Sequence, residues 1–208
     1  MTTYPLTFPS VGIVSSTFGI MRSTSSNRSP FTYRQQVYDF GGSMWQGEVT
    51  FMPMFNSDAS AIKAFLADLN GQFGTFLYGD PDFLALGALG TLGGTPLIKG
   101  AAQTGNTLEI DGATPLVTNW IRKGDYFQLG TGTDSRLYMI TQDANSDSSG
   151  NVTLTFQPSL RSSPSDNQAV TITGAKGLMR LASNGADWQS NYRPIYSVTI
   201  GFVEAISE

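Results

Sequence analysis

The sequence contains neither cysteine nor histidine. Without cysteine, the chain forms no disulfide, no thiolate metal site and no cysteine nucleophile. Without histidine, it lacks the commonest general base and the commonest metal ligand, so a Ser-His-Asp triad and a histidine zinc site are both excluded. We therefore expect no catalytic residue, no metal ion and no cofactor. An enzyme built on Asp and Glu alone, as glycosidases are, is the remaining enzymatic alternative.

Charged residues are also scarce, at 13% of the chain, which is roughly half the usual share of soluble domains. Such a composition fits a monomer with a polar uncharged surface or a subunit covered by neighbours, and we favour the covered subunit. The net charge is −4 with no Lys/Arg block, so we expect no specific nucleic-acid binding. No stretch approaches the roughly 18 apolar residues that span a bilayer, so we expect no membrane insertion.

Residues 15–54 have the pattern of antiparallel strands. Aromatic and β-branched residues lie between Gly, Ser and Pro clusters, which is typical of short strands and turns. The polar run at 23–30 predicts a break between strands, and Gly41-Gly42 predicts a tight turn. Pro53 is expected to end the ladder or to place it at a sheet edge, and a further short strand is expected at 73–78.

One helix is expected at 57–70. Its apolar residues follow a single-stripe spacing of i, i+3, i+4 and i+7: Ile62, Phe65, Leu66 and Leu69. Asn56, Ser57 or Asp58 is expected to cap its N-terminus, and Gly71 to follow its C-terminus. The stripe predicts that this helix packs on the sheet.

The composition changes near residue 79, and the stretch 84–94 is a nearly uncharged loop or linker. A second set of short strands is expected at 96–99, 107–110, 126–129, 137–141, 152–156 and 169–173, forming a small barrel or sandwich. A polar loop at 183–193 precedes a last strand at 196–206. We predict a mainly β protein with one α-helix, in which residues 1–85 plus 183–208 form one domain and residues 86–182 form an inserted β domain.

Two acidic segments are candidates for chemistry. Asp80 and Asp82 flank Pro81 and could bind a cation or do acid/base work. A Gly-Asp-Pro-Asp run is also an ordinary turn, which we favour. The segment from Asp143 begins like a calcium loop. The pattern then fails, because its sixth position is Ser148 instead of Gly and its twelfth is not Glu. A polar hairpin loop is therefore expected at this segment, and Lys123-Gly124-Asp125 is expected to be a turn.

The remaining candidates are residues for contacts with partners. Three arginines spaced through the first sheet either pair with acidic groups of neighbouring subunits or lie on solvated strand faces. The three tryptophans, Trp45, Trp120 and Trp188, either stack on sugars or are core or interface anchors. The candidate interface residues are Arg22, Arg28, Arg34, Trp45, Asp80 and Asp82.

Several runs of the sequence resemble the distal tail proteins of long-tailed bacteriophages and prophages. The runs are residues 29–38, 45–53 and 65–81, and in the second module residues 124–128, 137–138 and 158–161. The resemblance covers most of the chain and rests on overall pattern instead of a catalytic signature. A related minor tail protein next to the tail hub has a similar pattern and stays open.

The resemblance implies a tail-tube-like β-sandwich that closes into a hexameric ring, with an inserted small β-barrel or sandwich. Such a ring joins the tail tube to the baseplate hub in the virion, after synthesis in the host bacterial cytoplasm. The implied partners are further copies of the chain, the tail tube protein, the hub and other baseplate proteins. DNA would pass through the lumen without specific binding. The alternative is a carbohydrate-binding module for host adsorption, which would require an exposed tryptophan on a flat face of the second module.

Overall fold

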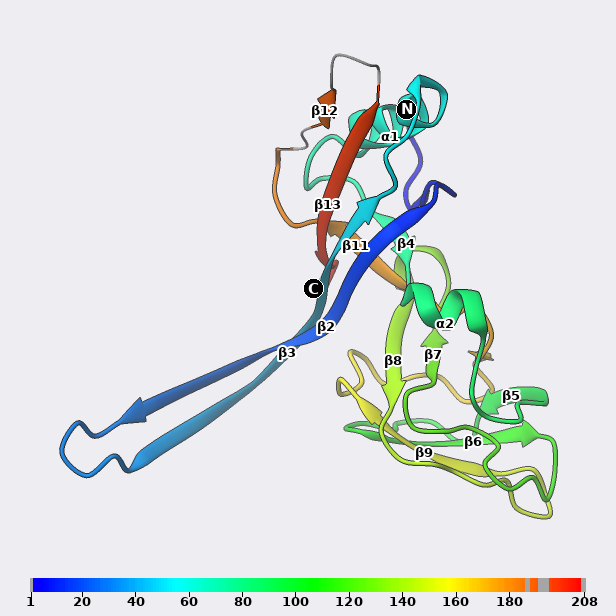
Figure 1. Cartoon of the computed structure of the whole chain (residues 1–208). Helices are drawn as coiled ribbons and strands as arrows, with labels where there is room; N and C mark the ends of the chain where they lie inside the picture. Colours follow the sequence, from blue (N-terminus) through cyan, green and yellow to red (C-terminus); the bar gives the residue numbers. More distant parts are fainter. Residues whose placement is uncertain (1, 186–187, 191–194, 207–208) are drawn as a thin grey trace.

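A computed structural model describes residues 2–185, 188–190 and 195–206. The described part of the chain consists mostly of strands in two sheets, with two α-helices and one short 3-10 helix. Figure 1 shows one sheet with helix α1 in the upper part of the molecule and the other sheet below it, while a long hairpin projects to one side. The prediction of a mainly β protein is confirmed, and the second α-helix was not predicted.

The first sheet has seven strands in the order β1-β4-β11-β13-β3-β2, with β12 also paired to β13. Their bounds are Leu6–Thr7 (β1), Ile13–Arg28 (β2), Gln35–Phe51 (β3), Phe76–Tyr78 (β4), Gly177–Leu181 (β11), Trp188–Ser190 (β12) and Tyr196–Glu204 (β13). β1 pairs parallel to β4, and the other pairs are antiparallel. Among the described strands, β2 therefore lies at one edge of the sheet and pairs with β3 alone.

Helix α1 (Asn56–Leu69) packs its predicted stripe into the core of the first sheet, which confirms the predicted helix. The predicted N-cap is wrong, since the N-cap residue is Phe55 and no described side chain caps the helix, whereas Gly71 follows the C-cap residue Asn70 as predicted. The chain leaves the helix through Asn70 and Gly71, both at positive φ (52° and 68°). This left-handed exit is typical of helix C-termini and turns the chain back toward β4.

The hairpin of β2 and β3 is longer than the sequence indicated. The polar run at 23–30 was expected to break the strands, but β2 continues to Arg28. Gly41 and Gly42 lie inside β3 instead of forming a turn. They belong to a bulge, because residues 40–42 of β3 stand opposite Ser23 alone, and the positive φ of Gly41 (74°) permits it. The turn lies at residues 29–34, where Tyr33 N donates to Ser29 O at 3.0 Å.

The second sheet has six strands in the order β10-β7-β8-β9-β6-β5. Their bounds are Gly94–Ile98 (β5), Thr107–Ala113 (β6), Tyr126–Leu129 (β7), Arg136–Ile140 (β8), Val152–Gln157 (β9) and Val170–Thr171 (β10). All six predicted strands are thus present, within three residues at each end. The two edge strands meet, because Ile98 N donates to Gln168 O and Asn167 N to Ile98 O, each at 2.9 Å. The sheet is therefore a nearly closed barrel.

The chain between the sheets is more ordered than a linker. Residues 81–86 form helix α2 (Pro81–Leu86), so the predicted Asp-Pro-Asp turn is wrong. Asp80 is the N-cap residue, and its Oδ1 accepts from Asp82 N at 3.0 Å. β11 was not predicted as a strand, and it pairs with β4 and β13 of the first sheet. The predicted loop at 183–193 contains β12, and residues 186–187 and 191–193 lie outside the described residues.

Candidate assembly interface

The outer half of the β2–β3 hairpin, residues 21–44, is exposed on both faces, and we call it the arm. It projects away from both sheets (Figure 1). Large apolar side chains are exposed along it: Met21, Phe31, Tyr33, Val37, Tyr38 and Phe40. Phe31, at the tip, is 92% exposed. Apolar side chains concentrated on a projecting hairpin are a sign of a surface that a partner covers.

The three candidate arginines all lie on the arm. Arg22 and Arg28 are in β2, and Arg34 is the last residue before β3. The Arg28 guanidinium lies 4.7 Å from the centre of the Tyr33 ring of the same tip. Within the described ranges, the one ion pair found is between two other residues, so none of the three arginines has a carboxylate partner there.

A groove runs along the open edge of β2, on its inner half near α2, and we call it the edge groove. It has a volume of about 550 Å³. Its apolar wall includes Val11, Val14 and Phe18, and its other wall is formed by the start of α2. The candidate residues Asp80 and Asp82 both line it. An unpaired strand edge beside apolar side chains is a surface to which a further strand or hairpin can add.

Trp45 differs from the other candidates because it is buried (1% exposed) in the first core. Its Nε1 donates to Leu137 O on β8 at 2.8 Å, and its ring stacks on Phe18 at 4.9 Å between centroids. Trp45 therefore joins β3 to the second sheet and does not reach the surface. The structure thus groups the arginines on the arm and the aspartates in the edge groove, and it places Trp45 in neither.

A buried carboxylate, which the sequence indicated as part of a turn alone, holds the connection between the sheets. Asp125 is 1% exposed. Its Oδ1 accepts from Leu89 N at 2.6 Å, and its Oδ2 accepts from Gly90 N at 3.0 Å and Arg122 N at 2.8 Å. The predicted turn at 123–125 is confirmed by the bond from Asp125 N to Arg122 O at 3.0 Å. Nothing in the sequence indicates that residues 87–90 return to this turn, so the role of Asp125 could not be predicted.

The acidic segment from Asp143 forms the predicted polar loop between β8 and β9 and lines a groove of about 590 Å³ with Lys99 and Glu109. Its carboxylates accept from backbone amides: Asp143 Oδ1 from Lys123 N of the neighbouring turn, and Asp147 Oδ1 from Asn151 N within the loop, each at 2.8 Å. Hydrogen bonds from the side chain and backbone N–H of Asn151 lower the pKa of Asp147. A glycosidase acid would need a raised pKa instead. Among the described residues, no group of three or more His, Cys, Asp or Glu is arranged to hold a metal ion.

The aromatic side chains of residues 86–182, a segment the structure describes in full, are all buried: Trp120, Tyr126, Phe127, Tyr138 and Phe156. The carbohydrate-binding alternative required an exposed tryptophan on this module, whereas Trp120 is 0% exposed. The partly exposed tryptophan is Trp188 (48%), which lies on β12 of the first sheet. The barrel formed by the second sheet therefore presents no aromatic platform for a sugar.

Sequence reasoning missed that the arm aromatics are exposed. Their segment was expected to form strands, and no exposed apolar face was predicted for it. One signal was available, because the facing strand at 24–28 contains no apolar residue. A two-stranded ribbon with apolar residues on one strand alone cannot bury them by itself, so they require another surface.

Residues 85–175, which include all six strands of the second sheet, match the family model described as distal tail protein pb9, B domain. No curated protein matches the chain. The protein class that the β fold and this domain indicate is a structural component of a phage tail. The match supports a phage distal tail protein family for the chain, and it confirms the resemblance drawn from the sequence. This family implies contacts with other tail components, and it favours a structural role over an enzymatic one.

No helix in the described part of the chain is both long enough and apolar enough to cross a membrane.

Proposed function

We propose that the chain is a ring-forming subunit of a phage tail tip, which joins the tail tube to the baseplate hub. The proposal rests on two surfaces that occur in one molecule: the exposed apolar arm and the open edge of β2. A long exposed edge is a site of strand pairing with another chain. Because the arm and the edge are different surfaces, a contact between them is head-to-tail, and such contacts close into rings when the rotation permits.

The proposal includes the division of the chain into two domains. Residues 1–85 plus 183–208 would form the ring domain, and the matched segment would form a domain inserted into it. Since β11 pairs with β4 and β13, we propose that the boundary lies before Gly177 instead of after residue 182. The ring domain would contact further copies, the tail tube protein and the hub, and the inserted domain would lie on the outside of the virion's tail tip.

Light scattering and negative-stain imaging of the purified protein test this function. We expect a closed ring, of six subunits by the family resemblance. The matched variant removes residues 24–39 and joins Ser23 to Phe40 through an Asn-Gly turn, which favours two-residue hairpins. This arm-shortened protein should stay folded and monomeric, because the removed residues are exposed. A wild-type protein that stays monomeric at high concentration and does not bind tail tubes would refute the ring.

A further inference from the structure

The charges of the arm and of the rest of the molecule have opposite signs. Residues 21–44 carry three arginines and one carboxylate, Asp39, so the arm has a net charge of +2. The whole chain carries −4, and the remainder therefore carries −6. Two of those negative charges, Asp80 and Asp82, line the edge groove beside its apolar wall. Complementary charge of this kind steers two surfaces together and fixes their register.

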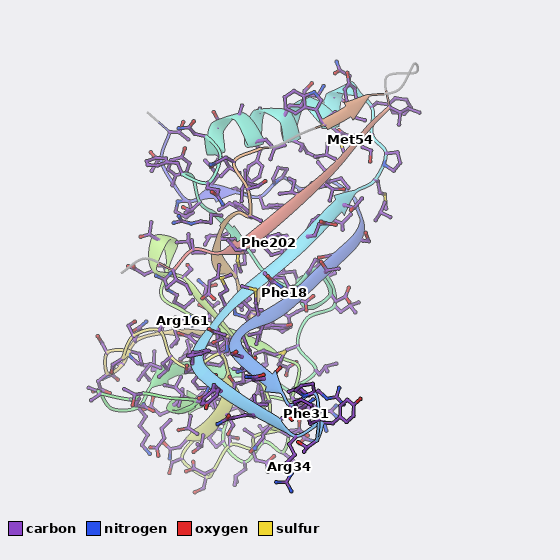
Figure 2. All side chains as sticks on the ribbon, turned by 90° about the vertical axis from the view of Figure 1, so that its left-hand side faces the viewer. Phe18, Phe31, Arg34, Met54, Arg161 and Phe202 are labelled. Carbon is purple, nitrogen blue, oxygen red and sulfur yellow. The ribbon has the colours of Figure 1, made fainter. Side chains whose placement is uncertain are left out.

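The arm tip is held in one shape before any partner binds. Ser29 Oγ accepts from Phe31 N at 3.4 Å and from Thr32 N at 3.3 Å, and Ser29 N donates to Arg34 O at 2.9 Å. Tyr33 adopts a positive φ of 57° within this turn. The turn presents Phe31 outward, and Figure 2 shows Phe31 and Arg34 together at the end of the hairpin. A preorganised tip loses less conformational entropy on docking than a flexible loop would.

The edge groove offers chemistry that matches this tip. Val11 and Val14 supply apolar surface for an aromatic ring, and Val14 is itself 59% exposed. Asp82 is exposed, while Asp80 is already engaged by Asp82 N and Tyr126 OH. Asp82 is thus the carboxylate of the groove that is available to an arginine. The same molecule's tip does not reach this groove, because its arm points away from α2 (Figure 1).

We propose that the arm tip of one copy docks in the edge groove of a second copy, with Phe31 against the apolar wall and Arg34 paired to Asp82. The inference rests on the proposed ring and names the two surfaces that make it. Arg28 stays stacked on Tyr33 and supports the tip from within the same copy. Each copy then inserts its tip into one neighbour and accepts a tip from the other, so every edge groove of a closed ring is occupied.

The absence of cysteine makes disulfide trapping a direct test, because any disulfide must join introduced residues. Arg34→Cys and Asp82→Cys variants, mixed under mild oxidation, should give a covalent dimer joined between the two sites. The matched control is Asp68→Cys, an exposed carboxylate on α1. It should give no dimer with Arg34→Cys above the level of random collision. A yield equal to this control, in protein concentrated enough to associate, would overturn the proposal.

Charge-reversal variants test this contact separately from the formation of the ring. Arg34→Glu or Asp82→Lys alone should raise the protein concentration for half-assembly about tenfold, a change that like charges brought face to face readily cause. The double variant should recover most of the loss. If the Arg34→Glu protein formed rings at the same protein concentration as the wild type, the docking would be overturned while the ring stayed intact. Absence of any association in all the proteins, together with absence of the disulfide, would overturn both.

Discussion

Arg161 and Glu204 form a two-point ion pair that ties the loop after β9 to the C-terminal strand β13. Arg161 Nε donates to Oε1 at 3.1 Å and a terminal nitrogen donates to Oε2 at 2.6 Å. Oε2 also accepts from Trp45 N at 3.0 Å. The Glu204 side chain is 2% exposed and the Arg161 side chain 14%. One carboxylate therefore joins both sheets through a side chain and a backbone amide, at the point where the matched domain meets the rest of the molecule.

Arg161→Leu should destabilise the protein, because it leaves Glu204 buried without its cation. Breaking one partner of a buried pair costs about 3–5 kcal/mol. Guanidinium unfolding measures the loss, and Arg122→Leu is the matched control because Arg122 is exposed. A loss no larger than that of the control would show that water replaces the ion pair without cost.

Removing the side chain of Asp125 should loosen the connection between the sheets. Asp125→Ala leaves three backbone N–H groups, of Leu89, Gly90 and Arg122, without their acceptor. Each unsatisfied buried group costs about 1–3 kcal/mol, so we expect a loss of at least about 2 kcal/mol. Hydrogen exchange should show the amides of residues 89–90 losing protection. Unchanged protection at these amides would contradict the role assigned to Asp125.

The contrast between Asp125 and α1 shows what the sequence could predict. The stripe of α1 repeats every turn, so local spacing alone identifies its buried face. Local pattern also identifies β7, whose apolar residues are mostly adjacent, and β9, whose apolar residues alternate with polar ones. Asp125 depends on residues 87–90 returning from a distance, which no local pattern encodes.

The full extent of the strands of the arm was not predicted from the sequence, for a different reason. Residues 24–28 are polar and resemble a loop, yet they form a strand because backbone pairing with β3 satisfies their amides without burying any side chain. Polarity therefore predicted the exposure of 24–28 but not their extended conformation. The acidic and basic candidate interface residues were chosen by their charge and position. Their separation into an arm and a groove depends on the tertiary fold.

A side chain at position 47 should not be accommodated. An added Cβ at Gly47 would collide with the carbonyl oxygen of Thr17 and lie 2.6 Å from Phe202 Cζ. The missing side chain lets Phe18 and Phe202 approach to 5.8 Å across β3 (Figure 2). Gly47→Ala should cost about 1–3 kcal/mol by overpacking. Gly19→Ala is the matched control, since a Cβ there meets nothing within 4 Å. Equal stability of the two variants in chemical unfolding would refute this packing.

Stability should fall in alkaline solution partly through Tyr78. Burial raises the pKa of Tyr78 from 10.0 to about 12, with Asp80 adding to the effect and Ser16 opposing it. A pKa that is higher in the folded protein means that the unfolded chain releases this proton first. The contribution is therefore fully present below pH 10 and is lost as the pH rises through the folded pKa. Tyr78→Phe should flatten the decline of unfolding free energy between pH 10 and 12, measured by guanidinium titration. A decline as steep in Tyr78→Phe as in the wild type would assign it to other groups.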